Sequence, residues 1–267
     1  MLAGLVIGGD QGLTLERCLA SLAGVDELVY VDAQSKDDSV SIARRCGARV
    51  VDAGAVRGGS QLRTLGAQHV TMPWIVSLAC DDVLDPGGAD VIRKTLCDVE
   101  RKRALGDKEA PDCLHVMVRN GSAAHEFHFP RVYRQSVKWV GRCHEYLASK
   151  PRGVVPVTIA HLAGPWHAKP TDPDGVLKLL WQDMQEIPEP RWTYYYAREW
   201  WYRGEWEKAA YWFEQRVQDV GFRGEMADAY LYLARCYWKL NRGNEARQAC
   251  LLALVVNADF KEAAAFM

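Results

Sequence analysis

The stretch "LAGLVIGGDQGLTLERCLASLAGVDELVYVDAQSKDDSVSIARRCGARVVD", residues 2–52, alternates two patterns. Short apolar runs closed by glycine or aspartate predict strands. Between them lie helical patterns: Leu15, Leu19 and Leu22 form one apolar stripe, and Gly47 follows the second helix as a stop signal. A third helix and a fourth strand follow, in "SQLRTLGAQHV" and "WIVSLACDD". Strands that alternate with helices predict an α/β layer with parallel strands.

Aspartates stand at the ends of three of these predicted strands. They are Asp10, Asp32 and Asp81. Ligands of such sheets bind beyond the carboxyl ends of the strands, so we expect an acidic site at that edge. The strand that leads to Asp81 and Asp82 has Ala79 where a partner carboxylate would be expected, which raises the question of whether a cation still binds.

Composition excludes several classes of protein. The 267 residues carry a net charge of −1, so nothing in the global charge favours nucleic acid or anionic membrane as a partner. Eight scattered cysteines without a CxxC pair predict reduced thiols. No apolar run approaches the ~20 residues of a membrane span, and the beginning of the sequence lacks the pattern of a signal peptide. We therefore expect a cytoplasmic protein without a membrane span.

The composition changes near Trp166. Before it, "LHVMVRN" and "EFHFPRVYR" predict two further strands in an antiparallel arrangement. After it, tryptophan, tyrosine, alanine and arginine dominate. The segment from Tyr194 aligns with the one from Leu231 at an offset of 37 residues, which superposes Ala197 on Ala234. This spacing resembles tetratricopeptide repeats and predicts two stacked helix pairs. We expect two domains, an α/β domain at 1–165 and a helical domain at 166–267, with the helical domain binding a protein partner or a second copy.

The order of these segments resembles the family 2 glycosyltransferases of the GT-A fold. Three stretches carry the resemblance: residues 5–52, then "RTLGAQHVTMPWIVSLACDDVL" at 63–84, then "PRVYRQSVKWVGRCHEYL" at 130–147. They are similar, in turn, to the opening strand and Asp-x-x-Ser-x-Asp turn of the family, to its Asp-x-Asp strand, and to its Gly-x-x-His-Glu segment. The expected fold class is therefore α/β, a GT-A nucleotide-sugar domain followed by an all-α, tetratricopeptide-like region.

The resemblance implies an enzyme that transfers a sugar, with inversion, from a nucleotide diphosphate donor, by default a UDP-sugar, to a hydroxyl acceptor. Mn²⁺ or Mg²⁺ would assist, because a hard dication held by a carboxylate neutralises a departing diphosphate. The acceptor is open between a glycan, a protein side chain and a hydroxymethylated DNA base, which in duplex DNA would have to be flipped out.

The resemblance also assigns roles to individual residues. Glu145 matches the general base, and Asp81 and His161 match the metal ligands, with His167 as the competing histidine. Asp82 and His144 match groups beside the metal or the acceptor. The expected nucleotide contacts are Gly9, Asp10, Asp32 and Arg63.

Other interpretations compete with these roles. Taken alone, Asp32 and Asp37 also suit helix N-termini, Arg63 suits a solvated helix face, and His161 suits a structural histidine. Arg131, Arg134, Lys138 and Arg142 suit either an anionic ligand or a solvated face. Ala79 and the "DQG" turn at Asp10 favour an inactive sugar-nucleotide fold that acts as a scaffold. A dinucleotide-binding oxidoreductase is weaker, because no G-x-G-x-x-G follows the first strand.

Overall fold

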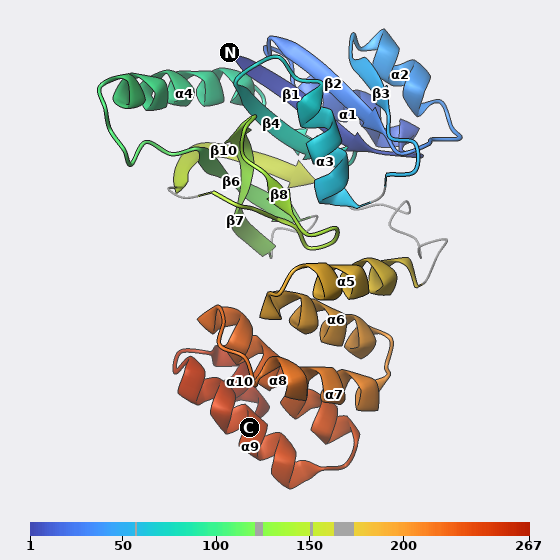
Figure 1. Ribbon diagram of the computed structural model, residues 1–267, viewed down its shortest axis with the longest axis vertical. Coiled ribbons are helices and arrows are strands. Elements are labelled where there is room, and N and C mark those ends of the chain that lie inside the picture. Colours follow the sequence, from blue (N-terminus) through green and yellow to red (C-terminus); the bar gives the residue numbers. More distant parts are fainter. Residues whose placement is uncertain (57, 121–124, 150–151, 163–173) are drawn as a thin grey trace. The chain divides into compact units, whose positions relative to one another are not determined.

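The chain forms two compact units, Met1–Lys169 and Pro170–Met267. The computed structural model describes residues 1–56, 58–120, 125–149, 152–162 and 174–267 (Figure 1). The boundary predicted at 165/166 lies outside the described residues, as does His167.

The first unit is built on an eight-stranded mixed sheet in the order β3-β2-β1-β4-β7-β6-β10-β5. Its first four strands in sequence are parallel, as predicted: β1 (Leu2–Gly8), β2 (Glu27–Asp32), β3 (Arg49–Asp52) and β4 (Trp74–Ala79). The others are β5 (Asp82–Leu84), β6 (Cys113–Asn120), β7 (His125–Arg134) and β10 (Arg152–His161). β7 runs antiparallel to both β4 and β6, which confirms the predicted antiparallel pair. A separate ribbon pairs β8 (Trp139–Val140) with β9 (Tyr146–Leu147).

Helices cover both faces of this sheet (Figure 1). On one face lie α1 (Gly12–Ser21), α2 (Ser39–Arg45) and α4 (Gly88–Ala104), whose Leu15, Ile42 and Ile92 share a core with Val6 of β1. On the other face, α3 (Gly59–Gln68) and the β8–β9 ribbon pack on alternate residues of the same strands. β1 is buried on both faces, which is why it reads as a continuous apolar run rather than an alternating one.

The second unit is helical. Its elements are α5 (Gly175–Glu186), α6 (Pro190–Tyr202), α7 (Trp206–Arg216), α8 (Arg223–Lys239), α9 (Gly243–Val256) and α10 (Lys261–Phe266). Successive helices pack on one another, and α6 also contacts α8. The alanines matched at the 37-residue offset, Ala197 with Ala234 and Ala209 with Ala246, are all buried. The tetratricopeptide assignment stays a prediction, whereas the α-helical nature of this region is confirmed.

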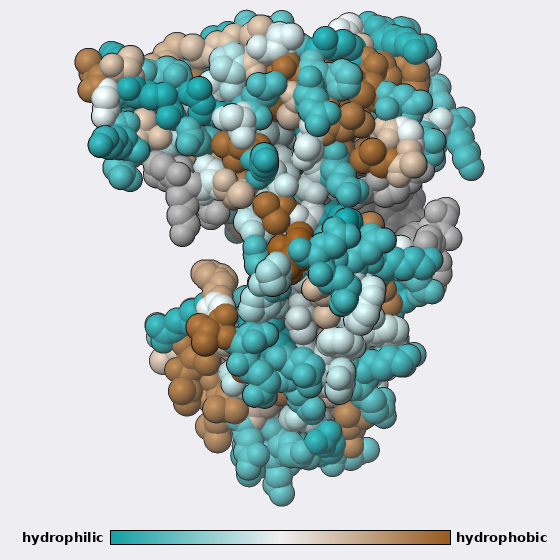
Figure 2. Space-filling view, in the orientation of Figure 1, coloured by the Kyte–Doolittle hydropathy of each residue, from teal (hydrophilic) through white to brown (hydrophobic). Residues whose placement is uncertain are grey.

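Apolar side chains are not all buried in this unit. Figure 2 shows hydrophobic residues gathered towards its α9–α10 end, where Leu251, Leu252 and Val255 of α9 are exposed. Among the described residues, no helix combines the length and the hydropathy needed to cross a membrane.

Candidate active site

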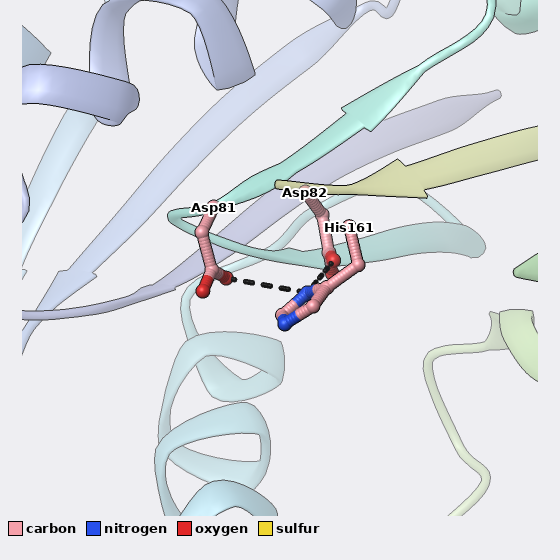
Figure 3. A group of neighbouring side chains, drawn as sticks. All are labelled: Asp81, Asp82 and His161. Atoms are coloured by element: carbon pink, nitrogen blue, oxygen red, sulfur yellow. Dashed lines mark hydrogen bonds and ion pairs between the residues drawn. The ribbon is translucent and has the colours of Figure 1, made fainter. Parts of the chain in front are cut away.

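Two carboxylates and an imidazole meet at one edge of the sheet. Asp81 follows the end of β4, Asp82 begins β5, and His161 ends β10 (Figure 3). The antiparallel pairing of β10 with β5 sets His161 directly opposite Asp82. One oxygen or nitrogen atom from each of the three side chains lies within 4.8 Å of the others. A strand end and a sheet pairing therefore bring together residues that are 80 positions apart in the chain.

Asp82 is the fully buried member of this group. Its Oδ1 lies 2.9 Å from Nδ1 of His161, and its Oδ2 accepts a 2.9 Å hydrogen bond from the Ala79 amide. The guanidinium Nη2 of Arg131, on β7, lies 3.3 Å from the same Oδ2. Burial raises the pKa of Asp82, but the Arg131 charge and these hydrogen bonds outweigh it, so the pKa lies below its usual value.

His161 faces both carboxylates. Its Nδ1 lies 3.7 Å from Oδ1 of Asp81 as well as 2.9 Å from Asp82. The hydrogen bond with Asp82 raises the pKa of His161, and the charge of Asp81 adds to it against the effect of burial. A carboxylate that holds one ring nitrogen fixes the orientation of the ring and directs the other nitrogen, Nε2, to a ligand.

These donors fit a divalent cation. Carboxylate oxygens are the ligands that Mg²⁺ and Mn²⁺ prefer, and an imidazole nitrogen suits Mn²⁺. Because Asp82 is engaged by His161, Ala79 and Arg131, the residues best placed to ligate are Asp81 and His161. Ala79 contributes its backbone amide to Asp82, so the position without a carboxylate still takes part in the site.

The loops after β1 and β2 form a second group. Asp32, buried at the end of β2, accepts hydrogen bonds from the Ser35 amide at 3.1 Å and from the Tyr30 hydroxyl at 3.1 Å. Asp10 lies across from it. Its carboxylate accepts the Lys36 amide at 2.6 Å, and its own amide donates to Oγ of Ser35 at 2.9 Å. Ser35 thus links the two aspartates that the sequence predicted at this edge.

Glycines at the end of β1 allow the backbone to pass close to its neighbours. Gly8 has φ +149°, and a Cβ there would lie 2.6 Å from Sγ of Cys80. At Gly9, a Cβ would lie 3.1 Å from the carbonyl oxygen of Ala33. The strand end beside Asp10 and Asp32 is therefore bare backbone, the form in which a ligand can approach peptide groups.

Arg63 and Glu145, predicted for separate roles, form an ion pair. Arg63 lies on α3, and its Nε donates to Oγ of Ser77 at 3.2 Å. Its guanidinium lies 4.7 Å from the centre of the Trp139 ring, and only 5% of the side chain is exposed. The interpretation of Arg63 as part of a solvated helix face is therefore wrong.

The segment around Glu145 is anchored on the N-terminus of α3. The Gly59 amide donates to the Arg142 carbonyl at 3.0 Å, and Gly58 has φ +94°. A Cβ at Gly58 would lie 2.6 Å from that carbonyl, so glycine is required there. His144 is exposed and has φ +54°, which turns the chain immediately before Glu145.

Arg131 was recognised only as one of several basic residues around a strand. In the structure its Nη2 lies 3.3 Å from Oδ2 of Asp82, and only 12% of its side chain is exposed. Arg134 instead pairs with Glu100 at 2.7 Å on the surface. The alternation of side chains along β7 separates the two, but nothing in the sequence says which one faces inward. Ser35, Tyr30 and Ser77 are further members of the site that the sequence reasoning did not single out.

Comparison with known proteins identifies similar folds. Residues 11–98 match the model of Glycosyl transferase family 2. This match covers about a third of the chain and lies within the first unit. The structure also resembles S. aureus TarS 1-349 in complex with UDP-GlcNAc, with a TM-score of 0.55 and 13% identity over 93% of this chain and 90% of that one. A second crystal structure of S. aureus TarS matches with a TM-score of 0.51 and 12% identity over 97% of this chain and 53% of that chain. At such identities the likeness establishes the GT-A-like fold alone.

Proposed function

We propose that this protein is a divalent-metal-dependent, inverting glycosyltransferase that moves a sugar from UDP to an acceptor hydroxyl. The observation that carries the proposal is the cluster of Asp81, Asp82 and His161 at the strand ends of a family 2 glycosyltransferase fold. The UDP-GlcNAc bound to the similar TarS structure supports a UDP-sugar as the donor.

In this proposal, separate groups of residues contact the donor and the acceptor. Asp81 and His161 would hold the cation, and Asp82 keeps His161 oriented through Nδ1. A bound cation supplies positive charge beside the diphosphate leaving group. The loops joined by Ser35, with Gly9, Asp10 and Asp32, would receive the nucleoside, since they lie at the carboxyl ends of β1 and β2.

Glu145 would act as the general base. As the acceptor oxygen bonds to the anomeric carbon, the bond from that carbon to the UDP oxygen breaks and the acceptor proton passes to the Glu145 carboxylate. The ion pair with Arg63 holds this carboxylate in one orientation, and Ser77 and Trp139 hold Arg63 in turn. His144 would lie beside the acceptor.

The acceptor class in this proposal is a glycan hydroxyl. A protein side chain and a hydroxymethylated DNA base are the other acceptors to be assayed. The helical unit would present the acceptor or join the protein to a partner or a second copy, and we propose a cytoplasmic location.

A thermal-shift series tests the proposal. The unfolding temperature is measured with UDP, GDP and CDP, each with Mn²⁺, with Mg²⁺ or with a chelator. A ligand present at 100 times its Kd stabilises the folded state by about 2.7 kcal/mol, so a rise with UDP that needs the metal is expected. Release of UDP from UDP-sugars, measured with and without candidate acceptors, then identifies the donor. The inactive-scaffold alternative predicts no UDP release with any donor, and that result across a complete donor panel would overturn the proposal.

A further inference from the structure

A row of arginine and tyrosine side chains runs along two adjacent helices of the second unit. On α6 it consists of Arg191, Tyr195, Arg198 and Tyr202; on α8, of Asp228, Tyr232, Arg235 and Lys239. We call these eight residues the Arg–Tyr stripe. Steps of four, three and four residues keep each set on one side of its helix. At 1.5 Å per residue, each row is about 16 Å long.

The two rows occupy equivalent positions. Every member on α6 is offset by 37 residues from its counterpart on α8, the same offset that relates the buried alanines. The rows also touch, because the Tyr202 and Tyr232 hydroxyls lie 3.4 Å apart and the Tyr194 hydroxyl donates to Asp228. The two rows therefore form one surface, in which a tyrosine followed three residues later by an arginine occurs at equivalent positions of both helices (Tyr195 and Arg198, Tyr232 and Arg235).

Its guanidinium groups are held on aromatic rings. Arg198 lies 4.6 Å from the centre of the Tyr195 ring and 5.8 Å from that of Tyr202. Arg235 lies 5.3 Å from the centre of the Tyr232 ring. Stacking fixes the plane of a guanidinium, so less freedom is lost when its N–H groups meet an anion.

Positive charge is concentrated on the Arg–Tyr stripe. The second unit as a whole contains more acidic than basic residues, yet the stripe carries four cations and one carboxylate. Elsewhere in the unit, Arg203, Arg216 and Arg242 are each paired with a carboxylate. Within the described residues, no carboxylate pairs with Arg198, Arg235 or Lys239. The positions of Arg198, Arg235 and Lys239 over aromatic rings, without a carboxylate partner in the described part of the chain, favour an external anion.

We infer that the Arg–Tyr stripe binds an acidic glycan chain, through its carboxylate or phosphodiester groups, and holds it as the acceptor substrate. The choice of a glycan rests on the proposed function. The guanidinium group of arginine can donate two parallel hydrogen bonds to a carboxylate or to a phosphodiester. The tyrosine hydroxyls can donate hydrogen bonds to sugar oxygens. A nucleic acid is disfavoured because stacked guanidinium groups already cover part of the tyrosine faces on which its bases would stack.

Binding can be measured without catalysis. Calorimetry on the full chain at low and high salt would use polygalacturonate as the carboxylate probe and a polyglycerol phosphate as the phosphodiester probe. Neutral dextran is the negative control, and a single-stranded oligonucleotide tests the other class of ligand. We expect binding of at least one acidic polymer that weakens with salt, and no binding of dextran.

Substitutions in the Arg–Tyr stripe test whether this surface binds the polymer. Each charge-assisted hydrogen bond contributes to the free energy of binding. The double variant Arg198→Gln with Arg235→Gln should therefore weaken binding of the acidic polymer by roughly tenfold or more. Lys239→Gln, at an exposed position where the ammonium lies 5.8 Å from the centre of the Trp206 ring, gives a second and less disruptive test. The matched control is Arg247→Gln with Lys261→Gln, two exposed cations outside the stripe, which should bind as the wild type does. Circular dichroism would verify that each variant is folded.

Three outcomes would overturn the inference: neither acidic polymer binds, the oligonucleotide binds more tightly than both, or the stripe variants bind like the control. None of them bears on UDP binding, which is measured on the same samples. Loss of UDP binding alone would count against the proposed function and leave the stripe result standing.

Discussion

Nδ1 of His161 lies 2.9 Å from Oδ1 of Asp82, and this contact joins the last residue of β10 to the first residue of β5. Asp82 is completely buried, whereas 31% of the His161 side chain is exposed. The buried partner fixes the ring, and the more accessible partner faces the space where a ligand would bind. We therefore propose that Asp82 supports the site and that His161, with Asp81, faces the ligand.

Removal of the Asp81 carboxylate, the proposed metal ligand, should abolish the coupling between cation binding and nucleotide binding. With few protein ligands, the cation is held mainly together with substrate phosphates and water. We therefore expect weak Mn²⁺ binding by the wild type alone, and much tighter binding with UDP present. Asp81→Ala should abolish that difference in calorimetry. If UDP binds the wild type equally well in a chelator, the site does not work through a metal.

Arg131 should contribute more to the stability of the protein than Arg134, which lies on the same strand. Arg131→Met leaves Asp82 buried without its cation and should cost about 3–5 kcal/mol of unfolding free energy. Arg134→Met, which breaks a half-exposed pair with Glu100, should cost at most about 1 kcal/mol. Urea denaturation compares the two. Equal costs would mean that Arg131 does not compensate the Asp82 charge.

Loss of the predicted base should affect turnover and spare donor binding. Glu145→Gln keeps the shape of the side chain but removes its ability to accept a proton, so turnover should fall by roughly a hundredfold or more. UDP affinity should stay within about twofold of the wild type, since Glu145 is not among the expected donor contacts. Because Arg63 loses its ion pair in this variant, the unfolding temperature is measured alongside. Near-normal turnover would eliminate Glu145 as the base.

The sequence predicted the parallel half of the sheet because each strand is a short apolar run followed by a helical pattern. It also predicted that Asp10, Asp32 and Asp81 would lie beyond the carboxyl ends of the strands, since the carboxyl ends of parallel strands share one edge. Both expectations needed only local periodicity and the rules of α/β folds. The helices of the second unit followed in the same way from the spacing of their alanines and aromatic residues.

Long-range pairing could not be predicted from these patterns. That His161 would lie opposite Asp82 depends on β5 joining the far edge of the sheet next to β10, a connection no local pattern encodes. The Arg63–Glu145 pair likewise depends on the docking of residues 142–145 on the N-terminus of α3. Only family resemblance placed these residues in a site, and it assigned Arg63 and Glu145 to separate roles without indicating that they form a pair.

Asp26 should make stability depend on pH in acid. The hydrogen bond from the Arg93 guanidinium, with others that include the Leu2 amide, holds the pKa of Asp26 well below its usual value. A folded-state pKa below the unfolded value stabilises the protein above the unfolded value near 4, and this contribution is lost as the pH falls further. Since 34% of the side chain is exposed, solvent screening limits it to about 0.5–1 kcal/mol. Asp26→Asn should therefore be less stable than the wild type in urea at pH 7, with the difference shrinking at pH 2 to 3.

A larger side chain at Ala234 should disturb the packing of the helical unit. Ala234 is completely buried on α8, at the position equivalent to Ala197 on α6, so both helices approach their neighbours through a small side chain. Ala234→Leu forces three additional carbon atoms into this contact and should cost about 1–3 kcal/mol through overpacking. Ala265→Leu, at an exposed position of α10, is the matched control and should change stability by less than about 0.5 kcal/mol. Thermal unfolding of the full chain, followed by circular dichroism at 222 nm (a standard helix signal), gives both values. A leucine tolerated at 234 as well as at 265 would mean that α8 packs loosely, and that the 37-residue match of alanines does not arise from close helix contact.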